Sequence, residues 1–139
     1  MMADTISAER RSWNMSRITG SNTKPELLLR SLLHRAGFKF RLHAKELPGR
    51  PDIVLPKYRI AIFVHGCFWH RHPGCRNATM PTTRTEFWSE KLNGNVERDV
   101  RNNAALEENG WKILTVWECD LKSDPKTVVT RLSEAIRGD

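Results

Sequence analysis

Residues 52–64 read DIVLPKYRIAIFV and contain two short apolar runs, Asp52–Leu55 and Arg59–Val64. The tripeptide Pro-Lys-Tyr separates the two runs, and this arrangement predicts a β-hairpin. The second run is apolar at five consecutive positions, which is typical of a strand that is buried on both faces. We therefore expect this strand to lie at the centre of a β-sheet, with the rest of the chain arranged around it.

Further elements are predicted on both sides of this hairpin. Before it, Thr23 and Glu26 have the spacing of a helix capping box, and apolar residues at helical spacing continue to Gly37. Phe38–His43 alternates apolar and basic residues, which predicts a strand with one buried face. After the hairpin we expect helices over 85–93 and 95–109, a strand over 112–117, and a last helix that begins after its N-cap, Asp124.

This order of elements predicts an α/β fold with a central mixed β-sheet flanked by helices. With 139 residues the chain has room for one domain with an apolar core. We interpret residues 1–20 as an N-terminal arm and residues 21–139 as that single domain. Within the domain, residues 65–81 (HGCFWHRHPGCRNATMP) have no regular period and are expected to form a loop.

The composition is that of a globular protein, with 39% hydrophobic and 28% charged residues. No apolar run approaches the roughly 20 residues of a membrane-spanning helix. The N-terminal residues also lack the apolar stretch of a secretory signal. We therefore expect a cytoplasmic protein that has no membrane partner.

The net charge indicates an anionic partner. The chain has 23 Lys and Arg against 16 Asp and Glu, which gives a net charge of +7. The stretch from Arg30 to Arg59 holds eight bases and two acids, and so carries most of this excess. Its side chains, Arg50 among them, are expected to contact this polyanion. The alternative is a charged face that only keeps the protein in solution.

Three cysteines and a histidine form a candidate metal site. Cys67, His72 and Cys75 have the spacing C-x4-H-x2-C in the predicted loop, and Cys119 follows the predicted strand 112–117. Four such ligands fill a closed tetrahedral site, so we expect structural zinc that ties the loop to the last strand. The alternative, burial of the thiols as small apolar side chains, is disfavoured because the polar loop offers little core.

A second candidate site lies at one end of the hairpin. Asp52 opens the first strand and His65 ends the second, and such ends are neighbours in an antiparallel pair. Asp52, the main-chain carbonyl of Val64 and His65 are therefore expected at one sheet edge, where oxygen ligands would suit Mg2+. His70 could deprotonate a water there. Taken singly, Asp52 is equally consistent with a turn, and each histidine with a structural role.

Aromatic residues accompany this loop. Phe68 and Trp69 lie within it, and Phe87 and Trp88 open the helix that follows. Such pairs usually belong to a core, but in a loop rich in His and Arg they cannot all be buried. Apolar side chains inserted between base steps kink duplex DNA, so we expect some of these residues to act as wedges.

Several motifs together resemble the very-short-patch repair (Vsr) DNA mismatch endonucleases. The motifs are GRPD at 49–52, FVHGCFWH at 63–70, TTRTEFW at 82–88, NVERD at 95–99 and VWEC at 116–119. The resemblance covers nearly the whole chain and implies a restriction-endonuclease-like fold. It also implies an enzyme that nicks DNA 5′ to the thymine of a T·G mismatch, which arises when 5-methylcytosine is deaminated.

The resemblance further implies roles for single residues. Asp52 and the carbonyl of Val64 match the magnesium ligands, and His70 matches the proposed general base. His65 and Asp99 match its active-site companions, and Glu26 matches an acidic residue near the metal-bound waters. The other matches are the zinc ligands Cys67, His72, Cys75 and Cys119, the intercalating Phe68, Trp69 and Trp88, and the DNA-contacting arm residues Met15 and Ile18.

Other functions remain compatible with these residues. One is a restriction-type nuclease of the same fold that cuts matched DNA, and another is a non-catalytic, zinc-stabilised DNA-binding module. A catalytic zinc hydrolase built on His65, His70 and His72 is disfavoured, because it leaves three cysteines without a role. The expected partners are double-stranded DNA with a T·G mismatch and, downstream, mismatch-repair proteins and a DNA polymerase. We expect a monomer, because nicking acts on one strand.

Overall fold

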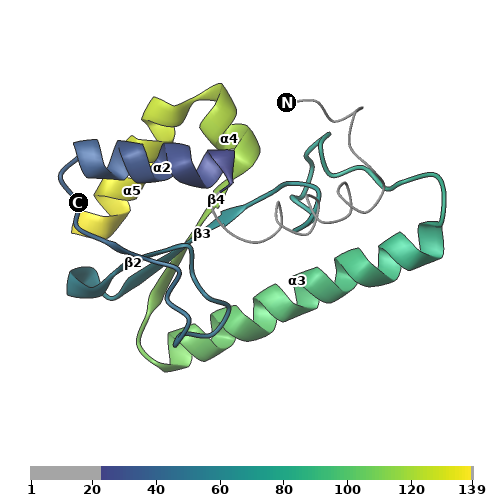
Figure 1. Cartoon of the computed structure of the whole chain (residues 1–139), viewed down its shortest axis with the longest axis horizontal. Coiled ribbons are helices and arrows are strands. Elements are labelled where there is room, and N and C mark those ends of the chain that lie inside the picture. The colour runs from purple at the N-terminus through teal and green to yellow at the C-terminus, as the bar shows by residue number, and fades with distance from the viewer. Residues whose placement is uncertain (1–22, 139) are drawn as a thin grey trace, which may run out of the picture.

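The computed structural model describes residues 23–138, in which a mixed four-stranded sheet has helices on both faces (Figure 1). The strands, in their order across the sheet, are β1 (Arg41–Leu42), β2 (Ile53–Leu55), β3 (Ile60–His65) and β4 (Lys112–Trp117). This arrangement confirms the predicted α/β class. Within the described part of the chain, no helix is both long enough and apolar enough to cross a membrane.

The β2–β3 hairpin forms as its two apolar runs predict. The strands pair antiparallel, with Ile53 opposite Ile62. A short 3-10 helix, η2 (Pro56–Tyr58), turns the chain, and Arg59 completes the turn with a left-handed φ of 56°. The paired side chains of both strands are almost completely buried, so this hairpin lies inside the molecule.

The strand β4 lies parallel to β3, which makes the sheet mixed. The chain reaches β4 through α3 (Thr85–Glu108), a continuous helix of 24 residues. The prediction of two helices, over 85–93 and 95–109, was therefore wrong. Gly94 lies between those ranges, but a glycine inside a helix costs only about 1 kcal/mol relative to alanine, and Gly94 does not adopt the positive φ that ends many helices.

Two apolar clusters cover the two faces of the sheet. The helices on one face are α2 (Lys24–Arg35), α4 (Glu118–Ser123) and α5 (Pro125–Arg137). On the other face, α3 packs through the buried Leu106 against Ala61 and Phe63 of β3. Figure 1 shows this division, with α2, α4 and α5 on one side and α3 on the other. Packing on both faces holds β2 and β3 in place.

Two elements differ from the sequence-based prediction. The strand β1 has only two residues instead of the range 38–43, because Phe38 packs into the core before the ladder begins and the chain turns at His43 with a φ of 48°. The helix α4 was not predicted, since six residues are too few to show helical periodicity. It places Leu121 in the core and begins immediately after β4.

The elements that carry the candidate residues meet at one edge of the sheet. The start of β2 lies beside the end of β3, and the end of β3 lies beside the end of β4. The segment 66–84 leaves β3 at this edge, and α4 begins there. The long helix α3 starts beyond that segment and runs back to the sheet (Figure 1).

Candidate active site and metal clusters

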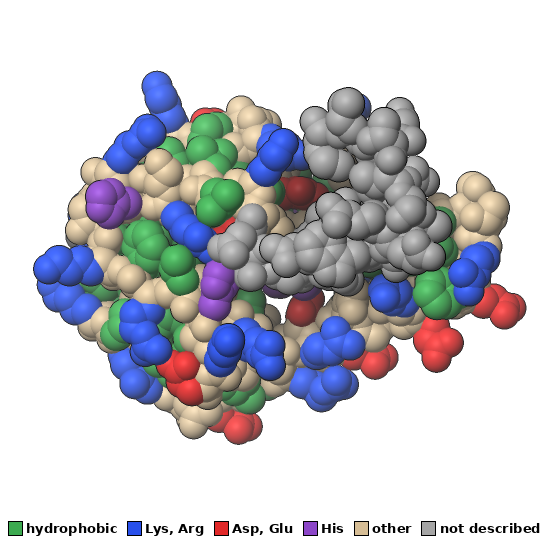
Figure 2. Space-filling view, in the orientation of Figure 1, with side chains coloured by type: hydrophobic (Ala, Val, Ile, Leu, Met, Phe, Trp, Pro, Cys, Tyr) green, Lys and Arg blue, Asp and Glu red, His purple; other side chains and the backbone are tan. Residues whose placement is uncertain are grey.

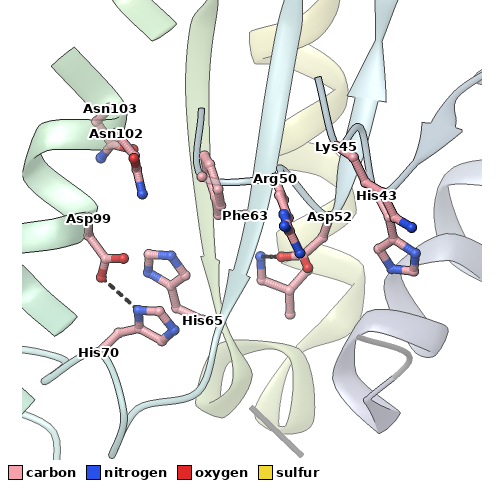
Figure 3. Close-up of a pocket in the computed structure, with 12 residues that line it drawn as sticks. His43, Lys45, Arg50, Asp52, Phe63, His65, His70, Asp99, Asn102 and Asn103 are labelled. Atoms are coloured by element: carbon pink, nitrogen blue, oxygen red, sulfur yellow. Dashed lines mark hydrogen bonds and ion pairs between the residues drawn. The ribbon is translucent and has the colours of Figure 1, made fainter. Parts of the chain in front are cut away.

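A cavity of about 550 Å³ opens at this edge of the sheet (Figure 3). Three parts of the chain line it: the segment between β1 and β2, the adjoining ends of the hairpin with the loop that follows, and α3. The lining residues are His43, Lys45, Gly49, Arg50, Asp52, Phe63, Val64, His65, His70, Asp99, Asn102 and Asn103. The structure thus brings five sequence-predicted residues, Asp52, Val64, His65, His70 and Asp99, to one cavity.

Asp52 lies immediately before β2 and faces the end of β3. Its Oδ2 accepts a hydrogen bond of 2.7 Å from the backbone N–H of Val64, so the carboxylate and the Val64 main chain are adjacent. The pKa of Asp52 is raised to about 7, because burial and the charge of Glu26 together outweigh the opposing hydrogen bond from the Val64 N–H. A carboxylate in such surroundings gains more from a nearby cation than one in water does.

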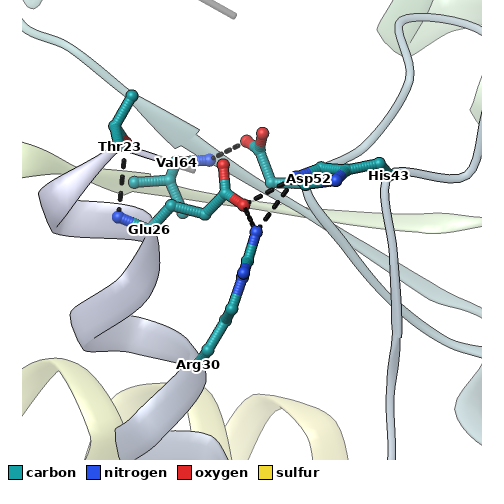
Figure 4. A network of polar contacts seen from close by, with 6 residues as sticks. All are labelled: Thr23, Glu26, Arg30, His43, Asp52 and Val64. Carbon is teal, nitrogen blue, oxygen red and sulfur yellow. Dashed lines mark hydrogen bonds and ion pairs between the residues drawn. The ribbon is translucent and has the colours of Figure 1, made fainter. Parts of the chain in front are cut away.

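Glu26 brings a second carboxylate to Asp52 from the first turn of α2 (Figure 4). Its side chain is 1% exposed and lies on the same helix face as the leucines that enter the core. Its Oε2 accepts a hydrogen bond from the Arg30 guanidinium and lies 2.7 Å from Nε2 of His43. Glu26, His43 and Asp52 each offer a ligand atom, and these atoms lie within 4.8 Å of one another.

Two histidines stack on the other side of the cavity (Figure 3). The ring centroids of His65 and His70 are 3.8 Å apart, and the ring planes differ by 3°. His70 Nδ1 lies 2.6 Å from Oδ2 of Asp99 on α3. Burial, together with the neighbouring His70, lowers the pKa of His65 to about 4, so His65 is neutral at pH 7. A histidine held by a carboxylate at Nδ1 keeps Nε2 free to accept a proton.

Several bases of the stretch from Arg30 to Arg59 contact other groups of the protein. Arg30 binds Glu26, Arg41 pairs with Glu46, and the guanidinium of Arg59 lies 4.6 Å from the ring centroid of Trp111. Within this stretch, Lys45 and Arg50 are the bases that line the cavity. Figure 2 shows further Lys and Arg side chains along the lower edge of the visible face.

The predicted zinc ligands form a cluster of their own. Cys67, His72, Cys75 and Cys119 each offer a ligand atom, and these atoms lie within 4.8 Å of one another. Cys67 directly follows Gly66 at the end of β3, and Cys119 lies in the first turn of α4. Burial raises the pKa of Cys67 to about 12 and also raises the pKa of Cys119. Three sulfur atoms and an imidazole in this arrangement could hold a soft divalent metal.

Trp117 and Glu118 connect this cluster to the cavity. The rings of His72 and Trp117 stack with centroids 4.1 Å apart, and the edge of Trp117 packs on His65 at 5.2 Å. Glu118 Oε1 accepts a hydrogen bond of 3.1 Å from the backbone N–H of Cys67. The sequence analysis assigned neither residue a role, although both belong to the VWEC motif at 116–119.

The aromatic residues form a separate group between the loop and the start of α3. The ring centroid of Phe68 lies 5.1 Å from that of Trp69 and 5.7 Å from that of Trp88, and Phe87 packs on Trp88. The three rings of Phe68, Trp69 and Trp88 are half-buried and Phe87 is 44% exposed. None of the four belongs to either apolar core of the described residues.

Several cavity residues were not found from the sequence. Asn102 and Asn103 lie three and four positions after Asp99, and this helical spacing was a usable signal. His43 ends the predicted strand 38–43 and Lys45 belongs to the basic stretch, but no local pattern places either residue at this cavity. The predicted arm, residues 1–20 with Met15 and Ile18, lies outside the described residues.

The chain is similar to a known family of proteins along most of its length. Residues 3–77 match the family model described as DNA mismatch endonuclease Vsr. The chain is 47% identical over 135 residues to the DNA mismatch endonuclease Vsr of Escherichia coli, which covers 97% of this chain and 86% of that protein. It is 50% identical over 131 residues to the type II nicking enzyme V.XorIIP of Xanthomonas oryzae pv. oryzae, with 94% and 95% of the two chains covered.

Proposed function

Since this chain belongs to the Vsr family of DNA mismatch endonucleases, we propose that it nicks duplex DNA 5′ to the thymine of a T·G mismatch. The reaction is Mg2+-dependent hydrolysis of one phosphodiester bond, and the mismatch is the product of 5-methylcytosine deamination in very short patch repair. One observation carries the proposal. One cavity is lined on one side by Asp52, which has the carboxylate of Glu26 close to it, and on the other side by His70 bound to Asp99.

The donors around Asp52 fit a hard divalent cation. Two carboxylates, those of Asp52 and Glu26, lie close together, and Arg30 compensates one of their two negative charges. Asp52 and the main-chain carbonyl of Val64 would hold the ion, and Glu26 would orient its water ligands. When bound there, such an ion would neutralise charge on the scissile phosphate and on the leaving 3′ oxygen.

His70 is the proposed general base. Asp99 accepts a hydrogen bond from Nδ1–H of His70, which leaves Nε2 to take a proton from the attacking water. The imidazolium that results is stabilised by the same carboxylate. His65 stacks against this ring as a neutral partner and limits its rotation.

The DNA backbone is proposed to enter the cavity past Lys45 and Arg50. Both side chains are exposed at its rim, and each could donate to a phosphate oxygen next to the scissile bond. Arg50 lies two residues before Asp52, so a phosphate held by Arg50 is brought close to that carboxylate.

The aromatic group is proposed to recognise the mismatch. A T·G wobble pair stacks poorly, so separating it from its neighbour costs less than separating a matched pair. Phe68, Trp69 and Trp88 are not required by either apolar core and are half-buried against one another, which suits side chains that enter a base step. Met15 and Ile18 of the arm are proposed to contact the opposite groove.

The cluster of Cys67, His72, Cys75 and Cys119 fits structural zinc. It supplies four soft ligands and therefore leaves no open position for a substrate water. We also propose that the mixed sheet, with a metal carboxylate at the start of β2 in its central hairpin, is a restriction-endonuclease-like fold.

A strand-mapping experiment tests this function. The substrate is a duplex with a central T·G mismatch in several methylation-site contexts, labelled separately on each strand, and the control is its fully paired twin. We expect one nick 5′ to the mismatched thymine, with Mg2+ and not with EDTA. Cutting of the paired duplex would instead indicate a restriction-type nuclease, and binding without cutting would leave a zinc-stabilised DNA-binding module.

A further inference from the structure

We propose that His43 is a positioning residue that fixes Glu26 beside Asp52 and thereby sets the affinity of the site for divalent cations. The inference deepens the proposed function and rests on it in one respect, which is that a cation binds at Asp52. His43 lines the cavity and belongs to the cluster of ligand-type side chains, although none of the motifs that identify the family contains it.

The imidazole of His43 holds the Glu26 side chain (Figure 4). Its Nε2 lies 2.7 Å from Glu26 Oε2, and a carboxylate oxygen can only accept, so the ring donates the hydrogen bond. The Arg30 guanidinium donates to the same oxygen, and its Nη2 also lies 3.1 Å from Nε2 of His43, so the three side chains form one contact cluster. Since the Glu26 side chain is 1% exposed, water has little access to replace a donor that is removed.

The main chain of His43 holds the Asp52 segment. Its N–H donates a hydrogen bond of 3.2 Å to the carbonyl oxygen of Asp52. One residue therefore contacts the side chain of Glu26 on α2 and the backbone of Asp52 before β2. These two carboxylates lie 26 positions apart in the sequence, and His43 joins their segments directly.

The backbone conformation of His43 sets the direction of its ring. Its φ of 48° lies in the left-handed region, where histidine is found more often than most other residues but still at a cost. Such conformations persist where the surrounding structure imposes them and are concentrated at functional sites. Here the left-handed turn after β1 directs the ring toward α2 while its N–H stays bonded to Asp52 (Figure 4).

Loss of the hydrogen bond between His43 and Glu26 should weaken cation binding without removing a cation ligand. Two neighbouring carboxylates repel each other, and Glu26 would turn from Asp52 when one of its donors is lost. Removal of a hydrogen-bond partner from behind a metal site typically lowers metal affinity by about 10- to 100-fold. We expect that effect for a side chain at position 43 that cannot donate to Glu26.

The test measures Mn2+ affinity by calorimetry on the full-length, zinc-loaded protein without DNA. His43→Leu is expected to weaken binding about tenfold or more, whereas His43→Gln, which retains an amide donor, should keep affinity within about threefold of the parent. His43→Asn tolerates the left-handed backbone but is too short to reach Glu26, so it should behave like the leucine variant. The matched controls, His34→Leu and His34→Gln on the exposed face of α2, should bind normally.

Two results would overturn the inference. One is unchanged Mn2+ affinity in His43→Leu and His43→Asn, provided that their melting temperatures and zinc contents show folded protein. The other is nitrogen hyperfine coupling to bound Mn2+ that disappears in His43→Gln, because His43 would then be a direct ligand. The variant Asp52→Asn tests the cation site itself. If Asp52→Asn binds Mn2+ normally, the assignment of the cation site in the proposed function is wrong, whatever the role of His43.

Discussion

Different forces hold the two regions that build the site. Glu26 and Asp52 belong to α2 and the β2–β3 hairpin, whose leucine and isoleucine side chains form the main core. His70 and two of the proposed wedge residues, Phe68 and Trp69, belong to the segment 66–84, in which Cys67 is the one fully buried residue. Packing therefore positions the carboxylates, while the four proposed zinc ligands and the Trp117 stack would position His70, the proposed general base.

This difference predicts that a substitution in one half of the site leaves the structure of the other half intact. A change at the carboxylates should remove chemistry and leave the structure intact. A change at the Cys/His cluster should remove the order of segment 66–84 and leave the sheet intact. The predictions below use this separation, beginning with the largest expected effect.

Asp52→Asn should abolish nicking, with a loss on the order of a thousandfold or more, because an amide neither carries charge nor ligates Mg2+ well. Single-turnover cleavage of the labelled T·G duplex measures the loss. Zinc content and the far-ultraviolet circular dichroism spectrum should match those of the parent protein. Nicking at near-parental rates would show that Asp52 does not hold the catalytic ion.

Trp69→Ala should reduce the discrimination between mismatched and paired DNA by about tenfold, which corresponds to about 1.4 kcal/mol. The reason is that a wedge gains more from the poorly stacked mismatch than from a matched step. Binding titrations on the T·G duplex and its paired twin give the ratio, and affinity for paired DNA should stay within about twofold. Equal loss on both duplexes would contradict the wedge role.

Metal-free protein should become less stable as the pH rises from about 4 to about 7. The pKa of Asp52 is raised to about 7 in the folded state, so the folded state holds a proton that the unfolded state has already released. The slope from this group is at most about 1.4 kcal/mol per pH unit. Urea unfolding of the parent and of Asp52→Asn in EDTA isolates this contribution, and identical slopes would contradict it.

Thr23→Ala should lower stability by about 1 kcal/mol and leave nicking within a few-fold of the parent rate. Thr23 caps α2, where its Oγ1 accepts a hydrogen bond of 3.4 Å from the backbone N–H of Glu26. The leucine face of α2 still holds the helix on the sheet when the cap is lost. Urea denaturation gives the stability change, and a loss of nicking as large as that of Asp52→Asn would show that packing does not fix Glu26.

The sequence predicts best where the signal is local. The capping residues of α2 and α5 and the apolar runs of β2 and β3 are each read within a few positions, and the structure has all of them. The same locality explains the placement of Asp52 beside Val64, because hairpin geometry alone brings them together. The spacing of Cys67, His72 and Cys75 is likewise short.

Contacts between residues that are far apart in the sequence could not be predicted, because tertiary packing determines them. His43 meets Glu26, and Trp117 stacks on His72, across 17 and 45 positions of sequence, so no periodicity reveals either contact. The helix α3 is continuous through Gly94 because the local cost of that glycine is small. The partners of Arg30 and Arg59 were likewise not predictable. Both residues count toward the basic stretch, but Arg30 binds Glu26 and Arg59 packs on the Trp111 ring.

Hydrogen exchange with and without zinc tests the central claim, that packing holds one half of the site and metal the other. After zinc is removed by a chelator, amides in segment 66–84 such as His70 and His72 should lose protection, while those of β2, β3 and β4 should keep it. Restored zinc should restore the loop amides. Equal loss of protection in the loop and in the three strands would contradict the account, because the metal would then hold the whole domain.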